Sequence, residues 1–359
     1  MAASTPSARS LDGKERKRKM KRAVMTAFAL AAALAAGVAT GDDDGSQVLH
    51  PSKPKIAGDP IGKYPVACTA RTTVAGEAPS LLPDGHEFKL VWADEFNGDA
   101  LDMSKWSFRT NFWGRRAHWF AAPEDGCVEV RDGVVRLKVK KLPNGQFVSP
   151  QLQTGGIMWD IPSVENPKGF WPLPGREKPK FVHRYGYYEC RLRLQRKPGW
   201  WSAFWMQTEM QGCCLDASFA GIEHDIMESF YPGDVGRHMF HYDGYGPDYK
   251  GYSIPGGIND KWIGSLSLDV DEFHTFGLLW EPDGYTTFVD GRRHGEKTGL
   301  AQGKPVSQIP EFILISTECM WYRKNHMTGK GEVAALEAAV AAGDCFTVDF
   351  VRVYDIVDR

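Results

Sequence analysis

Residues Gly221 to Ser229 read Gly-Ile-Glu-His-Asp-Ile-Met-Glu-Ser, and this stretch carries three carboxylates, Glu223, Asp225 and Glu228. Side chains on a β-strand alternate between the two faces, so Glu223 and Asp225 share one face. An unbroken strand would turn Glu228 to the opposite face. One bulged residue near Met227 resets the alternation and brings all three carboxylates to the same side. The spacing therefore predicts a bulged strand with an acidic face.

The neighbours of the carboxylates are apolar, which is not typical of a solvated acidic strand. Phe219, Ile222 and Phe230 flank them, and the bulge would turn His224 and Ile226 into the core. A calcium site is the other alternative, but calcium usually takes its ligands from a loop. Acids this close repel one another, and one of them must hold a proton near neutral pH. Retaining glycosidases use such a pair, with a nucleophile and a protonated acid about 5–5.5 Å apart.

Short alternating segments continue on both sides of this stretch. They are separated by turn pairs such as Asp132-Gly133 and Asp290-Gly291, which are typical of hairpins. Many short strands with few helical patterns predict an antiparallel β-sandwich. We expect one helix, residues 332–342, ended by Gly343. The expected strands are residues 89–92, 127–130, 134–139, 185–194, 275–280, 286–289, 312–316 and 346–354.

The first 40 residues have the pattern of a signal peptide. A basic run from Lys14 to Arg22 precedes the uncharged, Ala-rich stretch from Ala23 to Thr40. We therefore expect a secreted or periplasmic protein, and the alternative is a membrane anchor formed by an uncleaved leader. Residues 41–84 are expected to form a linker and N-terminal extension, and residues 85–359 the catalytic domain.

Composition narrows the class of partner. The net charge of -2 argues against nucleic acid and against an anionic membrane surface. The chain has 12 Trp, 12 Tyr and 19 Phe, an excess that favours a surface on which aromatic rings stack against a ligand. Seven Cys in an exported chain leave at least one that is unpaired or pairs outside the chain, and allow one or two disulfides. We expect a monomer whose partner is a polysaccharide.

Motifs along the chain resemble glycoside hydrolase family 16. Glu223 to Glu228 matches the bulged pattern E-x-D-x-x-E, and Pro198 to Met206 resembles PxGxWPAFWM with Ser202 in place of Pro. Further resemblances follow the family's order from about residue 86 to 356. They lie at Trp92–Gly98, Tyr185–Arg191, Phe273–Trp280, Val289–Gly291 and Asp349–Tyr354.

This resemblance implies a concanavalin A-like β-jelly roll with an open substrate cleft and a retaining mechanism. Glu223 would be the nucleophile, Glu228 the general acid/base, and Asp225 a helper that hydrogen-bonds the nucleophile. Trp201 and Trp205 would line the subsite at the cleaved bond. Alternation also places both on one face, although core packing is the ordinary role of Trp on a strand.

The resemblance also implies outer subsites and a metal site. Asn111 and Trp113 resemble an N-x-W loop on the donor side. His241, Asp243 and Tyr245, on the strand after the catalytic one, would lie near the acid/base or the substrate. No cofactor is needed for the chemistry. A structural calcium site is implied away from the cleft, with the ligands Glu95, the Gly133 carbonyl and Asp349.

Several departures leave the substrate open. Gly156 stands where many β-1,3-glucanases have Arg, and the segments Cys213–Phe219 and Trp159–Lys180 depart from the usual connections. The first hypothesis is endo-hydrolysis of a β-1,3- or mixed β-1,3/1,4-glucan. The alternatives are a galactan hydrolase of the agarase or carrageenase kind, a transglycosylase, and a non-catalytic carbohydrate-binding sandwich. The last would require loss of a catalytic carboxylate, and both glutamates are present.

Overall fold

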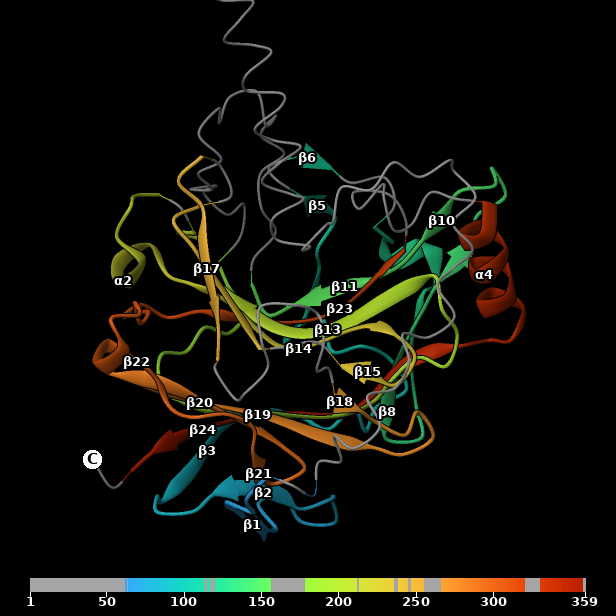
Figure 1. The fold of residues 1–359 in the computed structure, drawn as a ribbon. Coiled ribbons are helices and arrows are strands. Elements are labelled where there is room, and N and C mark those ends of the chain that lie inside the picture. Colours follow the sequence, from blue (N-terminus) through green and yellow to red (C-terminus); the bar gives the residue numbers. More distant parts are fainter. Residues whose placement is uncertain are drawn as a thin grey trace, which may run out of the picture.

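The computed structural model describes residues 62, 64–112, 115–116, 120–155, 178–211, 213–235, 238–244, 247–254, 266–319 and 330–357. Two nine-stranded sheets lie face to face (Figure 1), and the strand pairs that build them are antiparallel. The strand order is β17-β16-β14-β13-β23-β11-β4 in the sheet that carries the carboxylates, called the site sheet below. It is β21-β20-β19-β12-β24-β8-β7 in the second sheet. The predicted antiparallel jelly-roll sandwich is confirmed.

The site sheet consists of β4 (Ser107–Phe108), β11 (Gln151–Gln153), β13 (Trp200–Gln207), β14 (Glu223–Tyr231), β15 (Asp234–Val235), β16 (Met239–Tyr242), β17 (Lys250–Ser253), β18 (Leu266–Ser267) and β23 (Phe312–Cys319). The second sheet consists of β3 (Phe88–Asp94), β7 (Val128–Arg131), β8 (Val134–Lys138), β12 (Gly186–Arg193), β19 (His274–Glu281), β20 (Gly284–Val289), β21 (Arg292–Arg293), β22 (Thr298–Gly299) and β24 (Cys345–Ile356).

Three two-stranded ribbons and four short helical elements complete the described chain. The ribbons are β1 (Cys68–Arg71) with β2 (Ser80–Pro83), β5 (Asn111–Phe112) with β6 (Arg115–Arg116), and β9 (Lys140–Lys141) with β10 (Phe147–Val148). The helical elements are η2 (Pro123–Asp125), α2 (Ala217–Ala220), η4 (Leu300–Gln302) and α4 (Lys330–Ala341).

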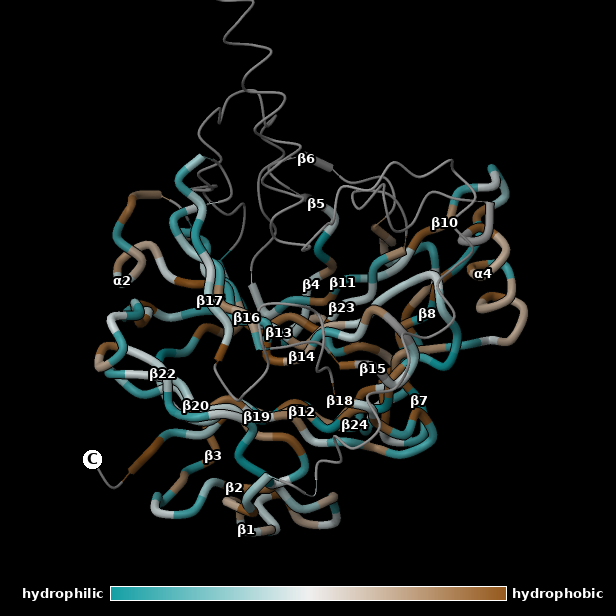
Figure 2. Tube along the Cα trace, viewed as in Figure 1, coloured by the Kyte–Doolittle hydropathy of each residue, from teal (hydrophilic) through white to brown (hydrophobic). Residues whose placement is uncertain are grey.

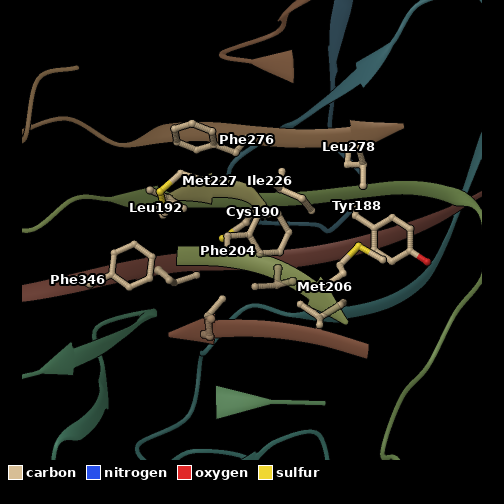
Figure 3. Close-up of a cluster of buried hydrophobic side chains, with 14 of the residues drawn as sticks. Tyr188, Cys190, Leu192, Phe204, Met206, Ile226, Met227, Phe276, Leu278 and Phe346 are labelled. Atoms are coloured by element: carbon tan, nitrogen blue, oxygen red, sulfur yellow. The ribbon is translucent and has the colours of Figure 1, made fainter. Parts of the chain in front are cut away.

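The core lies between the sheets and follows from the alternation in the sequence. Hydrophobic residues recur along β13, β14 and β19 (Figure 2), and their inward side chains pack together (Figure 3). The hairpins close as the turn pairs predict, because Asp132, Gly133, Asp290 and Gly291 all have positive φ. Each expected strand corresponds to an observed one, and the expected helix is α4, with Gly343 at φ +62 after its end.

The N-terminal extension contains a folded ribbon. Its described part forms the β1–β2 ribbon on the outer side of the second sheet (Figure 1). Beneath it, Glu189 is fully buried and accepts a hydrogen bond from the backbone N–H of Leu81 at 2.6 Å. The buried guanidinium of Arg352 donates to Ser80 Oγ at 2.8 Å. Burial raises the pKa of Glu189 to about 7. The ribbon is therefore attached through buried polar groups.

All seven cysteines lie in the described residues and all are free thiols. The one or two disulfides that the sequence allowed are therefore not formed in this structure. Cys213 and Cys214 are neighbours with their sulfurs 3.9 Å apart. The expected signal peptide lies outside the described residues. No helix within the described ranges is long and apolar enough to cross a membrane.

Candidate active site

The carboxylates lie on β14, and a bulge sets their direction. Across the β13–β14 ladder, Trp205 pairs with Asp225 and Phe204 pairs with Met227, so Ile226 is the extra residue. Ile226 and Met227 are both buried in the core and are labelled among the packed side chains in Figure 3. The predicted bulge is confirmed, and it occurs one residue before Met227.

The bulge divides the strand into an inner and an outer set of side chains. His224 is fully buried, with Nδ1 2.7 Å from Oε2 of the buried Glu311. Glu223 and Glu228 are half-buried, whereas Asp225 is 6% exposed. We call the side opposite the core, which carries these three acids, the carboxylate face. The inward direction of His224 and Ile226 agrees with the sequence prediction.

Glu223 and Asp225 each have a defined partner. Nε2 of Gln207 donates to Oε2 of Glu223 at 2.9 Å. His241 is the backbone partner of Glu223 across β14 and β16. Its Nε2 lies 2.9 Å from Oδ2 of Asp225. Ligand atoms of Glu223, Asp225 and His241 lie within 4.8 Å of one another. Because His241 contacts Asp225 at hydrogen-bond distance, the arrangement is that of a hydrogen-bonded cluster rather than of ligands spread around an ion.

Tyr249 extends this cluster. Its hydroxyl lies 2.5 Å from Nδ1 of His241, and the two rings stack with centroids 5.6 Å apart. Burial, with the charges of Glu223, Asp225 and Glu228, raises the pKa of Tyr249 above its ordinary value. The phenol therefore keeps its proton at neutral pH and donates it to Nδ1, which leaves the ring proton on Nε2, facing Asp225.

The tryptophans lie where alternation predicts. Trp205 is 9% exposed, its indole N–H donates to Ser316 Oγ at 3.0 Å, and the Arg109 guanidinium lies 5.1 Å from its ring centroid. Trp201 is 3% exposed and lies 5.3 Å, ring to ring, from Phe230. Both belong to the carboxylate face by strand register, while their contact with a sugar stays a prediction.

Arg109 and Gln207 are site residues that the sequence did not reveal. Nη1 of the buried Arg109 donates to Oε1 of Gln207 at 3.1 Å, which fixes the amide with its nitrogen toward Glu223. Gln207 continues the alternation of Trp201 and Trp205, so the strand pattern could have predicted that its side chain lies on the carboxylate face. Arg109 and Tyr249 carry no local signal, because strand pairing brings them here from elsewhere.

Of the remaining residues predicted to contact the substrate, one forms an ion pair and the others cannot be placed within the described part of the structure. Asp243 has φ +62 at the end of β16 and pairs with Lys250 at 2.8 Å across the hairpin, so its observed contact is a turn ion pair. Asn111 begins β5, but its side chain lies outside the described part of the structure. Trp113 and Tyr245 also lie outside the described residues.

The residues of the implied calcium site do not offer a free set of ligands. Both carboxylate oxygens of Glu95 accept from Arg352, at 2.8 and 2.7 Å. Asp349 pairs with Arg191, and Gly133 lies in the β7–β8 turn with φ +71. Two guanidinium groups thus supply the positive charge that a calcium ion would bring. In this arrangement the residues do not fit the ion, and calcium stays an untested prediction.

An all-β sandwich with three carboxylates on one face of a bulged strand has the groups that glycosidic cleavage needs. A family model described as "Glycosyl hydrolases family 16" matches residues 174–335, which include β13 and β14. Over these residues the chain is similar to this family.

Relatives and solved structures agree with this assignment. The chain is 26% identical over 223 residues to "Glucan endo-1,3-beta-glucosidase A1" of Niallia circulans, spanning 56% of this chain and 28% of that protein. It is 26% identical over 298 residues to "Beta-porphyranase C" of Zobellia galactanivorans, spanning 74% of this chain and 77% of that one. The chain therefore covers well under half of the first relative.

Among solved structures, the fold resembles that of SCLam, a non-specific endo-beta-1,3(4)-glucanase from family GH16, with a TM-score of 0.52. The identity is 21%, and the match covers 82% of this chain and 98% of that one. The laminarinase from Rhodothermus marinus gives the same TM-score and identity, covering 76% and 100%. At this identity the likeness supports the fold alone.

Proposed function

We propose that the chain is a retaining, endo-acting glycoside hydrolase that cleaves a β-linked polysaccharide. One observation carries this proposal. The extra residue Ile226 turns Glu228 to the same face of β14 as Glu223, with Asp225 between them. A smooth strand would separate the two glutamates across the sheet, and no single sugar could reach both. The bulge thus supplies the pair of carboxyl groups that double displacement requires.

In the proposed reaction, the carboxylate of Glu223 attacks the anomeric carbon while protonated Glu228 gives its proton to the leaving glycosidic oxygen. Glu228 then removes a proton from water, which attacks the same carbon and releases Glu223. Gln207 holds one oxygen of Glu223 by its 2.9 Å hydrogen bond. Asp225, within 4.8 Å of Glu223 by ligand atoms, adds negative charge beside the nucleophile and lies 2.9 Å from Nε2 of His241.

This chemistry is carried by side chains alone and requires no cofactor. Glu223→Gln and Glu228→Gln should each lower kcat by orders of magnitude while circular dichroism shows an unchanged fold. Anomeric configuration, followed by NMR in the first minutes of hydrolysis, should be retained. Inversion would exclude Glu223 as the nucleophile, and near-normal turnover by either variant would defeat the proposed mechanism. The same spectra separate water from sugar acceptors and so test the transglycosylase alternative.

For the substrate we propose a β-1,3- or mixed β-1,3/1,4-glucan. Support comes from the names of two relatives, the Niallia circulans glucanase and a "Glucan endo-1,3-beta-glucosidase" of Cryptopygus antarcticus, 28% identical over 214 residues. The galactan alternative has support of its own. The match to Beta-porphyranase C spans more of this chain, and a "Kappa-carrageenase" is 26% identical over 218 residues.

One structural feature bears on this choice. The Arg109 guanidinium lies over Trp205 on the carboxylate face, a positive group of the kind that a sulfated galactan would engage. Its partner Gln207 already occupies it in part, which favours a neutral glucan. Product release from laminarin, lichenan, agarose and carrageenan decides between them. Activity on the galactans alone would overturn the glucan assignment.

We also propose that the protein is exported and acts as a monomer on a polysaccharide outside the cell. The basic run and the apolar stretch of the first 40 residues support export. Mass spectrometry of the N-terminus of protein recovered from the medium tests this. A retained leader in a membrane fraction would favour the anchored alternative.

A further inference from the structure

Beside the bulge, the ladder on the other edge of β14 is interrupted. β16 pairs with β14 from Glu223 to Asp225, and β15 pairs with it at Ser229 and Tyr231. The register of these described strands therefore leaves Ile226 opposite neither β15 nor β16, just where β13 also skips it. A buried carbonyl at such a position needs a hydrogen-bond donor from elsewhere.

A histidine supplies that donor. Nδ1 of His238 lies 2.6 Å from the carbonyl oxygen of Ile226, and the residue is 3% exposed. A carbonyl only accepts hydrogen bonds, so Nδ1 carries the ring proton and Nε2 is the acceptor. Nε2 lies 2.6 Å from Nδ1 of His294, which is 7% exposed and must therefore donate. The two contacts fix one tautomer on each ring.

The second histidine connects this contact to the opposite sheet. The backbone N–H of His294 donates to Thr287 O at 2.8 Å, and Thr287 Oγ1 donates back to His294 O at 2.6 Å. The ring of Tyr64 packs edge-on against His294, with centroids 4.7 Å apart. Thr287 lies on β20, so the bulge carbonyl is held through two rings by the second sheet. Burial lowers the pKa of His238 to about 3, which agrees with a neutral ring.

We propose that His238 is a positioning residue that acts through the Ile226 carbonyl to set the direction of Glu228. The inference rests on the proposed hydrolase function. Rotation of the bulged peptide changes which face the following side chains take, and Glu228 follows Ile226 by two residues. Glu223 and Asp225 precede the Ile226 peptide on β14 and contact Gln207 and His241, whereas Glu228 follows that peptide, so a change in the bulge alters the direction of Glu228.

Two variants with the same side-chain chemistry test the position of the donor. His238→Asn keeps an amide N–H near the position of Nδ1, within reach of Ile226 O. His238→Gln moves the amide to the position of Nε2, out of reach of that carbonyl. We expect His238→Asn to keep kcat within about 3-fold, and His238→Gln to lose about 10- to 100-fold in kcat with little change in KM, the scale set by a small misplacement of a catalytic group.

A second readout identifies the group that is displaced. A dinitrophenyl β-glycoside of the cleaved oligosaccharide needs no acid to release its leaving group, and azide needs no general base to attack the intermediate. If Glu228 is misplaced, azide and this substrate should restore the turnover of His238→Gln to within about 3-fold of wild type. A defect that persists under these conditions would overturn the assignment to Glu228.

His274→Gln serves as the control for loss of stability alone. It disturbs another ring hydrogen bond, His274 to Asp290 at 2.7 Å, between β19 and the turn after β20 of the second sheet. It should lower the melting temperature without changing kcat. Folded His238→Gln protein with wild-type kcat would contradict the positioning role. Normal turnover by Glu223→Gln would instead defeat the hydrolase proposal, so the two failures are distinguishable.

Discussion

Nε2 of His241 lies 2.9 Å from Oδ2 of Asp225 while its other nitrogen faces the Tyr249 hydroxyl at 2.5 Å. The ring therefore stands between a carboxylate that accepts and a phenol that donates. Gly251, opposite His241 on β17, leaves room for this arrangement, because a Cβ there would lie 3.3 Å from Nδ1 and 3.0 Å from the Tyr249 hydroxyl. With the phenol as donor to Nδ1, the proton on Nε2 faces Asp225.

Tyr249→Phe should remove the preference of His241 for the tautomer with its proton on Nε2. The variant removes the donor to Nδ1 but keeps the stacked ring, so the fold should persist. Long-range proton–nitrogen NMR should show His241 protonated at Nε2 in the wild type and a mixture of tautomers in the variant. We expect kcat to fall by about 10-fold, the lower end of what misaligned catalytic hydrogen bonds cost. Wild-type protein with the proton on Nδ1 would refute the assigned direction.

Gln207→Glu should change the pH dependence of catalysis. It places a second carboxylate where the amide now donates to Glu223 at 2.9 Å. Two adjacent carboxylates share one proton, so the nucleophile becomes fully ionised only at higher pH. The acid limb of the kcat/KM profile should therefore move to higher pH, whereas Gln207→Leu should lower activity without that movement. An unshifted acid limb in Gln207→Glu would show that this contact does not govern the nucleophile.

Glu189 should make stability fall with rising pH. Burial raises its folded-state pKa to about 7 from its ordinary value of 4.5. Between these values the folded state binds more protons than the unfolded state. The free energy of unfolding therefore decreases as pH rises through this window and levels off above pH 7, by at most about 1.4 kcal/mol per pH unit.

Glu189→Gln retains the acceptor for Leu81 N–H but does not titrate. Its stability relative to the wild type should increase from pH 5 to pH 7, as measured by urea unfolding. A relative stability that does not vary with pH would mean that Glu189 is ionised throughout this range. In the wild type, protection of the β1–β2 ribbon against hydrogen exchange should also decrease from pH 5 to pH 7, because that ribbon covers the carboxyl group.

The sequence predicted the parts of this site that depend on local periodicity. Period-two alternation placed Glu223 and Asp225 together, and the odd spacing from Glu223 to Glu228 indicated a bulge near Met227 that restores Glu228. These inferences needed no long-range information, because a strand's two faces are fixed by its own sequence. The helix of residues 332–342 was predictable for the same reason, since an Ala-rich run before Gly343 has strong helical propensity.

Features that depend on register could not be predicted in this way. Arg109 meets Gln207, 98 positions later, and Tyr354 meets Ser80 across 274 positions. Such pairs are set by how strands align after folding, and no local pattern identifies the partner. The disulfide expectation failed for a related reason, because a count of cysteines says nothing of their distances, and here all seven are free.

Arg109 and Gln207 should act as a unit. The Arg109 guanidinium lies 5.1 Å from the Trp205 ring centroid and donates to Gln207 Oε1, which turns the amide nitrogen to Glu223. Lysine cannot reproduce this planar fork, so Arg109→Lys should lower kcat by about 10-fold although the charge is kept.

If Arg109 works by orienting the amide, its loss matters only while that amide is present. The double variant Arg109→Lys/Gln207→Leu should therefore be no slower than Gln207→Leu alone. Arg184→Lys, which alters a similar guanidinium–aromatic contact at Tyr185 just before β12, should leave kcat unchanged. Steady-state kinetics of the four proteins in the cycle provides the measurement. Losses that simply add would show that Arg109 acts on the substrate directly, and would revive the anionic galactan as the polymer cleaved.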